Sequence, residues 1–303
     1  MRGLVSSWPL VEAGQQSPEQ AMEYMVANYS GKPVLVYIGE PDIAARFAYN
    51  ESCTGFNYRA EKMNLVDVFC SIREGFDRTK HPYYYINSLL YDVGFPGLQD
   101  ENNLPFDHKV FESSSLTSKI WIGTESRAPA HYDVPSNIAC CIVGKRRFTL
   151  FPPEQVHNLY PGPLEPTPGG QVTTMVDLKN PDFKAYPRFR DALEVSVVAD
   201  LEPGDALYYP SMWWHEVEAR DRFNVMVNYW WTTSPPYMGN PMDAVLHAML
   251  AVRERPAREK QAWRELFDYY IFGSAERPRT HLPEACHGAL GEMDEMRARQ
   301  LRS

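Results

Sequence analysis

The fold is decided by a stretch that reads Pro129-Ala-His-Tyr-Asp133, then Asn137-Ile-Ala-Cys-Cys-Ile-Val143, Gly144-Lys145 and Arg146-Arg-Phe-Thr-Leu-Phe-Pro-Pro153. The runs on either side of Gly144-Lys145 are apolar and rich in β-branched and aromatic residues, so they predict two strands joined by a hairpin tip. Downstream, the sequence predicts a turn over 201–205 and further strands over 206–210 and 223–230.

The histidines and the aspartate of this region have the spacing of a metal site. His131 and Asp133 are separated by one residue, which in a β-strand places both side chains on the same face. His215, at the end of Ser211-Met-Trp-Trp-His215, supplies a third donor. Two imidazoles and one carboxylate on one side of an ion form the facial triad of non-haem Fe(II) oxygenases. We therefore predict that these three residues bind Fe(II).

The stretch from about residue 126 to residue 231 resembles the cupin-like jumonji-C (JmjC) hydroxylases, and among them the asparaginyl hydroxylases that act on the hypoxia-inducible factor. The resemblance implies a mainly β fold with flanking helices: a double-stranded β-helix of the jelly-roll or cupin type, followed by a C-terminal helical segment. It also implies Fe(II), 2-oxoglutarate as cosubstrate, and O2. The matching pieces are Pro129–Asp133, Asn137, Leu150-Phe-Pro-Pro153, Leu159-Tyr-Pro161, Asn180-Pro-Asp182, Pro203-Gly-Asp205, Trp213-Trp-His215 and Val227-Asn228.

The same resemblance implies which residues hold 2-oxoglutarate, with two departures from the family pattern. The family anchors the distal carboxylate with a lysine two residues after the glycine of the predicted hairpin, and Arg146 occupies that position. Arginine can bind a carboxylate bidentately, but its reach differs from that of lysine. The family threonine that assists this lysine is replaced by Ala128. A family tyrosine on the preceding strand matches Tyr84, although alternation leaves open which residue of Tyr83-Tyr84-Tyr85 faces the site.

Two asparagines complete the expected cosubstrate site. Asn137 and Asn228 occupy positions that the family uses near the metal-binding end of 2-oxoglutarate. Buried amides need hydrogen-bond partners, so a purely structural network is the alternative for this pair.

Composition narrows the class of protein. The 303 residues, with 44% hydrophobic content and 13% aromatic content, suit one large domain or a domain with an appendage. The formal net charge of −9 makes a nucleic-acid partner unexpected and is compatible with a basic substrate. The 5 cysteines are odd in number and form no Cys-x-x-Cys pair, which argues against a zinc ribbon or a disulfide framework. With no signal-peptide pattern and no long apolar run, we expect a cytoplasmic protein that does not enter a membrane.

Three regions are expected along the chain. Residues 1–118 should flank the barrel, with a helix over 17–30 capped by Ser17, strands over 33–38 and 83–90, and a helix over 64–73. Loops and a short helix are expected over 96–118. Residues 119–235 should form the cupin core. Residues 236–303 should form a C-terminal helical segment.

Two segments outside the predicted strands bear on function. The proline- and glycine-rich residues 154–194 lie between the ligand-bearing strands, which is compatible with a cover over the barrel mouth or with a surface insertion. Residues 241–273 predict two helices with apolar residues at helical spacing. The resemblance implies that such helices mediate homodimerisation.

The leading hypothesis is an Fe(II)- and 2-oxoglutarate-dependent dioxygenase that hydroxylates a protein side chain or a small molecule. A non-catalytic, metal-binding cupin that acts as a binding or regulatory module is the alternative, and Ala128 and Arg146 keep it open. A cupin enzyme of another class is disfavoured by the His-x-Asp pair, because such cupins carry more histidine ligands.

Overall fold

The computed structural model describes residues 1–106, 111 and 115–302. The loops and short helix expected over 96–118 therefore lie partly outside the described residues. Contacts within the chain define two compact units, Met1–Thr233 and Ser234–Ser303, and each is described by itself.

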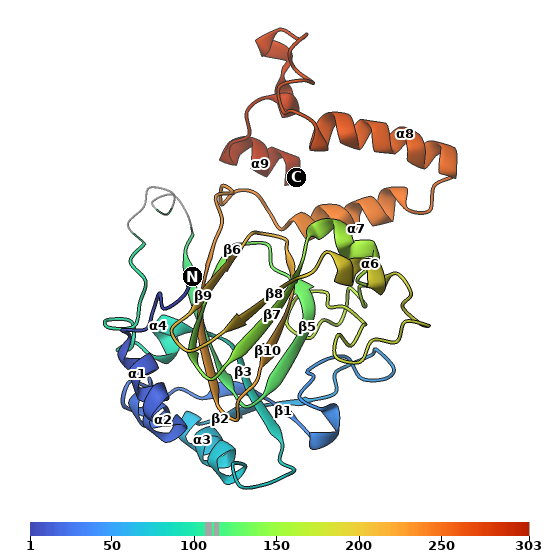
Figure 1. Ribbon diagram of the computed structural model, residues 1–303. Helices are drawn as coiled ribbons and strands as arrows, with labels where there is room; N and C mark the ends of the chain where they lie inside the picture. Colours follow the sequence, from blue (N-terminus) through green and yellow to red (C-terminus); the bar gives the residue numbers. More distant parts are fainter. Residues whose placement is uncertain (107–110, 112–114, 303) are drawn as a thin grey trace. The chain divides into compact units, whose positions relative to one another are not determined.

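The first unit contains two antiparallel sheets of a jelly roll (Figure 1). The larger sheet has the order β2-β1-β3-β4-β11-β6-β9 and the smaller has the order β5-β10-β7-β8. The mainly β, jelly-roll fold predicted from the sequence is thereby confirmed, although the two sheets do not join into a closed barrel. The strands are β1 (Val34–Gly39), β2 (Arg59–Met63), β3 (Tyr83–Leu90), β4 (Thr117–Gly123), β5 (Ser126–Tyr132), β6 (Ser136–Val143), β7 (Arg146–Phe151), β8 (Val197–Leu201), β9 (Ala206–Tyr209), β10 (Trp214–Ala219) and β11 (Asn224–Trp231).

The two sheets face each other across a shared core. Ala139, Cys141 and Met226 of the larger sheet pack with Phe148 and Leu150 of the smaller one. Side chains alternate between the two faces of a strand, so the alternate residues of the larger sheet, such as Cys140 and Val227, point to its other face and are buried in a second core there.

The predicted hairpin at Gly144-Lys145 is wrong. β6 pairs with β11 and β9, whereas β7 pairs with β10 and β8, so the chain crosses from one sheet to the other at this turn. Gly144 has φ of 72°, and a Cβ atom there would lie 2.7 Å from the carbonyl oxygen of Phe223. Glycine is therefore required here because the chain passes from one sheet to the other. The local sequence does not distinguish such a turn from a hairpin.

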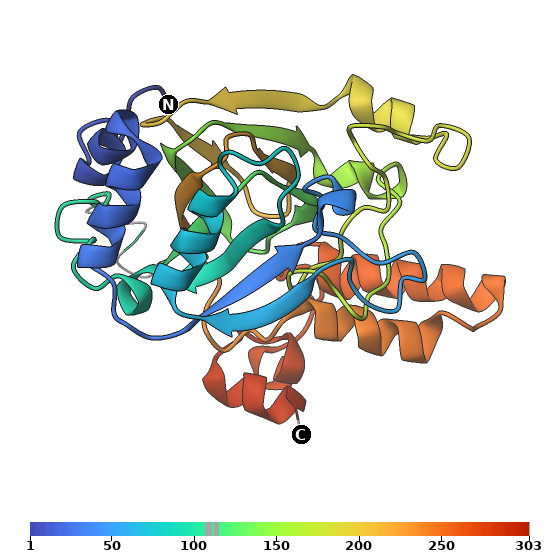
Figure 2. The same cartoon turned by 90° about the horizontal axis from the view of Figure 1, so that it is seen from below.

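Helices cover the outer face of the larger sheet (Figure 2). The predicted helix ends are confirmed at Ser17, whose hydroxyl accepts from the Gln20 N–H, and at Asn64, whose side chain accepts from the Val66 N–H. A further helix that begins at Pro9 was not predicted. The helical elements of this unit are α1 (Pro9–Gln16), α2 (Pro18–Ala27), η1 (Pro41–Ile43), α3 (Leu65–Glu74), α4 (Tyr91–Gly94), η2 (Pro153–His157) and α6 (Phe189–Glu194).

Residues 154–194 are tied to the smaller sheet rather than loosely inserted. Leu159, Val176 and Phe189 form a second core with Ala130 and Trp214. The Thr174 N–H donates to the Ala130 carbonyl at 2.7 Å, and Thr173 bridges to His131. Part of the segment also lines the cavity described below, so it covers the site.

A buried ion pair fixes this covering segment to β5. The Arg127 guanidinium lies 2.6 Å from the Asp177 carboxylate, and the two side chains are 6% and 30% exposed. Burial raises the pKa of Asp177, but the bond from Arg127 outweighs it and the net pKa is lowered. The pair therefore contributes stability above the unfolded carboxyl pKa of about 4, and this stability is lost as the pH falls through the lower folded pKa.

Asp177→Asn should lower the free energy of unfolding at pH 7 by about 2 kcal/mol, because a buried guanidinium loses its carboxylate. The loss should shrink towards pH 3. Asp200→Asn is the matched control, since Asp200 pairs with Arg147 on the surface with 51% exposure, and it should cost less than about 1 kcal/mol. Denaturant unfolding at both pH values measures the difference, and equal losses for the two variants would contradict the prediction.

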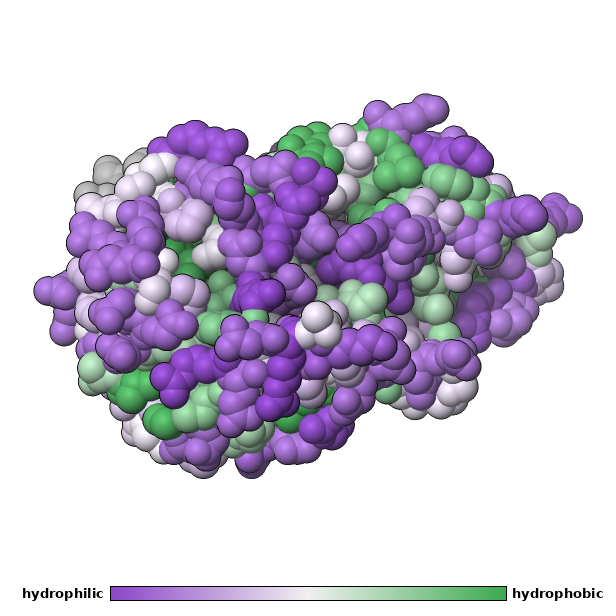
Figure 3. All heavy atoms as spheres, turned by 60° about the horizontal axis from the view of Figure 1, so that its bottom comes forward, coloured by the Kyte–Doolittle hydropathy of each residue, from purple (hydrophilic) through white to green (hydrophobic). Residues whose placement is uncertain are grey.

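The second unit is helical and leaves many apolar side chains exposed. It contains α7 (Pro241–Val252), α8 (Ala257–Phe267), η3 (Asp268–Phe272), η4 (Glu284–Cys286), η5 (Gly288–Leu290) and α9 (Glu295–Arg302). No side chain of α7 or α8 is buried. On the face of the molecule shown in Figure 3, hydrophobic residues form separate patches among hydrophilic ones. None of the described helices is long and apolar enough to cross a membrane.

Candidate metal centre

The three predicted ligands meet at the edge of the smaller sheet. β5 and β10 are neighbours, and their register places His215 directly opposite His131. Asp133 follows the last residue of β5, and its carboxylate lies 3.5 Å from His215 Nε2. The donor atoms of His131, Asp133 and His215 all lie within 4.8 Å of one another. One divalent ion could therefore contact all three, with the cavity on its open side.

Backbone carbonyls orient both imidazoles. His131 Nδ1 lies 2.9 Å from the Pro129 carbonyl oxygen, and His215 Nδ1 lies 3.0 Å from the Trp213 carbonyl oxygen. Carbonyls only accept, so each Nδ1 carries the proton and each Nε2 keeps its lone pair for a metal. This second-layer arrangement is typical of histidine ligands.

Electrostatics keep the donor set in its ligand form. Burial, together with the neighbouring His215, lowers the pKa of His131 to about 4, so the ring is neutral at physiological pH. Burial raises the pKa of Asp133, but the contact with His215 and the charge effect of both imidazoles outweigh it, and the net pKa is lowered. Neutral imidazoles and an ionised carboxylate are the forms that bind a divalent cation.

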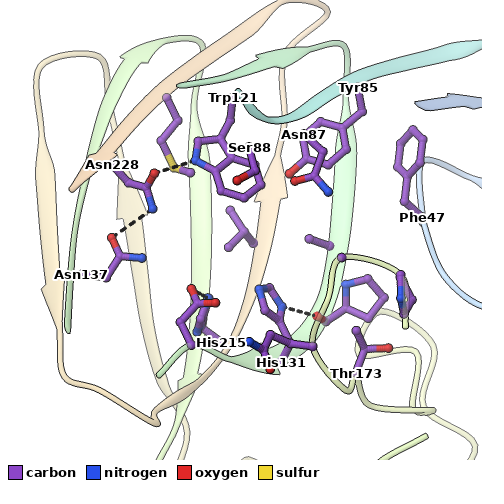
Figure 4. A pocket seen from close by; sticks show the side chains of 18 of the residues that line it. Phe47, Tyr85, Asn87, Ser88, Trp121, His131, Asn137, Thr173, His215 and Asn228 are labelled. Carbon is purple, nitrogen blue, oxygen red and sulfur yellow. Dashed lines mark hydrogen bonds and ion pairs between the residues drawn. The ribbon is translucent and has the colours of Figure 1, made fainter. Parts of the chain in front are cut away.

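A cavity opens from the metal centre between the two sheets (Figure 4). The empty space between its walls, counted together with solvent at the mouth, is about 800 Å³, and all three candidate ligands line it. Pro168, Gly169, Gln171 and Thr173 of the covering segment form one side of it.

The two predicted asparagines lie side by side in the cavity wall. Asn228 donates to the Asn137 side-chain oxygen at 3.3 Å and accepts from the Trp121 indole at 2.7 Å. Asn137 donates to the Tyr209 hydroxyl at 2.6 Å. Asn137 and Asn228 are 0% and 1% exposed. The network fixes both amides at the cavity, and their contact with a cosubstrate stays a prediction.

Arg146 lies on the interior face of β7 but outside the lining of the open cavity. It is 3% exposed, on the same strand face as Phe148 and Leu150. Among the described residues, no hydrogen-bond acceptor or carboxylate partners its guanidinium, and its Nε is buried without a bond. Burial lowers its pKa, with small opposing effects from Cys141 and Tyr85. A buried cation without an anion is costly, which is the signature of a group that awaits an anionic ligand.

The tyrosine that faces the site is Tyr85, and the choice of Tyr84 was wrong. Tyr84 packs against the core beneath the outer helices, whereas Tyr85 lines the cavity. Burial raises the pKa of Tyr85, and the charge of Arg146 opposes this effect, so the phenol and the guanidinium interact. A shift of one residue in a strand moves a side chain to the other face, so a loose match to the family segment could not decide between them.

Ala128 lines the cavity opposite Val217, so the predicted loss of a hydroxyl at this position is real. Sequence reasoning missed several other lining residues, among them Phe47, Asn87, Ser88, Trp121 and Tyr209. Trp121 and Tyr209 could have been found from the alternation of their strands. Asn87 and Ser88 reach the cavity through a register shift in β3 that no pattern in the sequence indicates.

Comparisons with known proteins agree with this geometry. The model of the cupin-like domain family matches residues 1–237. The lysine-specific demethylase JMJ31 of Arabidopsis thaliana is 32% identical over 52% of this chain and 30% of its own length. The human HSPB1-associated protein 1 is 30% identical over 57% of this chain and 32% of its own length. The chain therefore spans about a third of these two curated relatives. The tRNA wybutosine-synthesizing protein 5 of Gallus gallus is 31% identical over 74% of this chain and 69% of its own length.

Proposed function

Since the chain belongs to the cupin-like, JmjC-type family, whose members are Fe(II)- and 2-oxoglutarate-dependent oxygenases, we propose that it is a dioxygenase that hydroxylates a protein side chain or a small molecule. The observation that carries the proposal is the convergence of His131, Asp133 and His215 at one end of a cavity. The relatives are distant, so the substrate is argued from this chain alone.

The donor set fits Fe(II). Two imidazoles that direct their Nε2 atoms away from the backbone carbonyls, together with one carboxylate, suit a divalent ion, and both imidazoles are pre-oriented by those carbonyls. When bound, iron supplies the activation of O2. In the overall reaction, 2-oxoglutarate is oxidised to succinate and CO2. One oxygen atom of O2 enters succinate, and the other is inserted into a C–H bond of the substrate.

Arg146 and Tyr85 would hold the far carboxylate of 2-oxoglutarate. A carboxylate beside Arg146 would satisfy the buried guanidinium and accept a hydrogen bond from the Tyr85 hydroxyl. Tyr85 could thus take over the donor role that Ala128 cannot fill. The keto-acid end of the cosubstrate would then face the metal centre, beside Asn137 and Asn228.

The rest of the cavity orients the substrate and limits its contact with water. The covering segment closes one side through Pro168, whose carbonyl accepts from the Tyr58 hydroxyl at 2.7 Å. The aromatic rings around Tyr85 form an apolar part of the cavity wall opposite the metal centre. The chain's contribution to catalysis is therefore position and shielding.

The proposal is tested by measuring the products formed from the cosubstrate. Protein reconstituted with Fe(II) and given 2-oxoglutarate labelled at carbon 1 should release labelled CO2 and an equal amount of succinate when O2 is present. Omitting either iron or O2 should abolish both products. Release of neither product, with metal and 2-oxoglutarate shown to be bound and candidate substrates supplied, would refute the proposal.

We also propose that the C-terminal unit pairs with a second copy of itself. Apolar side chains on α7, α8 and η3 are exposed, including Leu250 at 85% and Phe272 at 76%. α8 carries charges of both signs, Arg258, Glu259, Lys260, Arg264 and Glu265, so an antiparallel pair of copies would be electrostatically complementary. Burying these faces between identical chains would give a two-fold interface.

Sedimentation velocity should show a dimer of the full chain at micromolar concentration. Leu250→Glu combined with Phe272→Glu should shift it to monomer, because two charges would enter an apolar interface. Met296→Glu, on α9 with 70% exposure, is the matched control and should leave the dimer intact. A monomeric parent chain would show that these faces do not pair with a second copy.

A further inference from the structure

The pairing register of β3 shifts at the point where the strand passes the cavity. Ile86 pairs with Ile122 of β4, but the next pair is Leu89 with Ile120, so two residues of β3 stand opposite one of β4. Those two residues are Asn87 and Ser88, and Ser88 has φ of 57°, a left-handed conformation that non-glycine residues rarely adopt. Strained backbone of this kind is often kept where it aims a side chain at a ligand.

The irregularity turns two consecutive polar side chains towards the same space. In a regular strand Asn87 and Ser88 would point to opposite faces, yet both line the cavity. Figure 4 shows them beside Trp121 and Tyr85, across the cavity from the imidazoles of His131 and His215. Gln171 reaches the cavity from the covering segment. None of these three side chains has a hydrogen bond to another described residue, so their polar groups are available to a ligand.

Aromatic rings form the wall next to these polar groups. Tyr85 is stacked on Trp121 with ring centroids 6.2 Å apart and 23° between their planes. Phe47 lies 5.4 Å from Tyr85 and 5.5 Å from Tyr58, centroid to centroid. Phe47 is tilted by 44° from Tyr85 and by 56° from Tyr58, so the rings pack on one another as an apolar wall and leave no box between them for a cation.

The cavity also carries almost no charge. No lysine or arginine lines it among the described residues, and Asp133, a candidate metal ligand, is its one carboxylate. Burial raises the pKa of Tyr58 and of Tyr85, so both phenols are neutral. Away from the metal centre and from Arg146, a charged substrate group would lose its hydration here without gaining a partner.

We propose that this cavity takes an uncharged, flat ring whose edge carries hydrogen-bonding groups, with the ring packed against the aromatic wall of Phe47, Tyr58 and Tyr85 and the edge bonded to Asn87, Ser88 and Gln171. That this ring belongs to the substrate rests on the proposed function. The amides and the hydroxyl can each donate and accept, which suits a lactam or a similar heteroaromatic edge.

Three probes of similar size test the proposal. The first is 1(2H)-isoquinolinone, which is flat, uncharged and carries a lactam edge. The second is the N-methylisoquinolinium ion, which is flat but cationic, and the third is decahydroisoquinolin-1-one, which keeps the lactam but is not flat. Each is titrated into the full-length protein loaded with Mn(II), and the paramagnetic relaxation of its protons and the quenching of tryptophan fluorescence are recorded.

The flat lactam should bind with its ring protons strongly relaxed, and the other two probes should bind at least about tenfold more weakly. Asn87→Leu should weaken the flat lactam about tenfold, the effect of one lost hydrogen bond of about 1.4 kcal/mol. Ser88→Gly should weaken it while relieving the backbone strain, so lost binding cannot be assigned to misfolding. Asn180→Leu, at an exposed turn away from the cavity, is the control and should change nothing.

Two results would overturn the inference: equal or tighter binding of the cation, or binding of the flat lactam that Asn87→Leu does not weaken. A failure of the proposed function is detected by metal binding, independently of ring binding. Mn(II) loading is followed by water-proton relaxation before any probe is added, and a chain that binds no metal would still report ring binding by tryptophan fluorescence.

Discussion

Replacing His131 or Asp133 by alanine should abolish turnover and lower metal affinity at least about 100-fold, while the chain stays folded. Each change removes one of three donors, which is more severe than loss of a second-layer group, worth about 10- to 100-fold. The fold should survive because both side chains face the cavity and neither belongs to one of the hydrophobic cores. Calorimetric titration with a divalent metal, circular dichroism and succinate formation measure the three quantities.

His157→Ala is the matched control. His157 lies in η2, is exposed and contributes no atom to the cavity. It should bind metal and turn over like the parent chain. Activity that survives Asp133→Ala in buffers stripped of other metals would remove Asp133 from the ligand set, and with it the facial arrangement on which the proposed chemistry depends.

Arg146→Met should raise the Kd for 2-oxoglutarate by about 10- to 150-fold, the range for a lost charged hydrogen bond of about 1.5–3 kcal/mol. The same change should leave the free energy of unfolding unchanged or increase it, because a buried cation without a described partner is replaced by an apolar side chain of similar length. Arg146→Lys should fall between Arg146→Met and the parent chain, since it keeps the charge but loses the bidentate geometry.

The two measurements separate a binding role from a structural one. Isothermal titration with 2-oxoglutarate under anaerobic conditions gives the first, and denaturant unfolding without ligand gives the second. A strong loss of stability with unchanged 2-oxoglutarate affinity would mean that Arg146 serves the fold and that the cosubstrate is held elsewhere.

The convergence of His131, Asp133 and His215 was predictable because its signal is local. His131 and Asp133 share a strand face by spacing alone, and the Trp213-Trp-His215 motif marks the third ligand. The strands were also predictable, because short apolar runs bounded by glycine and proline have few other structures available. These features depend on neighbours within a few residues.

What failed depended on tertiary structure. The turn at Gly144 has the composition of a hairpin, and only the pairing of β6 and β7 with different partners shows that it crosses between sheets. Tyr84 and Tyr85 are chemically identical neighbours, and only the strand register separates them. Asn87 and Ser88 reach the cavity through an extra residue in β3, for which no local residue pattern is diagnostic.

Binding of Fe(II) and 2-oxoglutarate at His131, Asp133 and His215 is tested by anaerobic reconstitution with Fe(II). The protein is then titrated with 2-oxoglutarate while the visible metal-to-ligand charge-transfer band is followed. O2 is admitted last. We predict a saturable band, a weaker band in Arg146→Met, and formation of succinate after O2 is admitted. Metal that binds without any band would contradict the account, because it would show that Arg146 and Ala128 mark the loss of the cosubstrate site and that the chain is a metal-binding module.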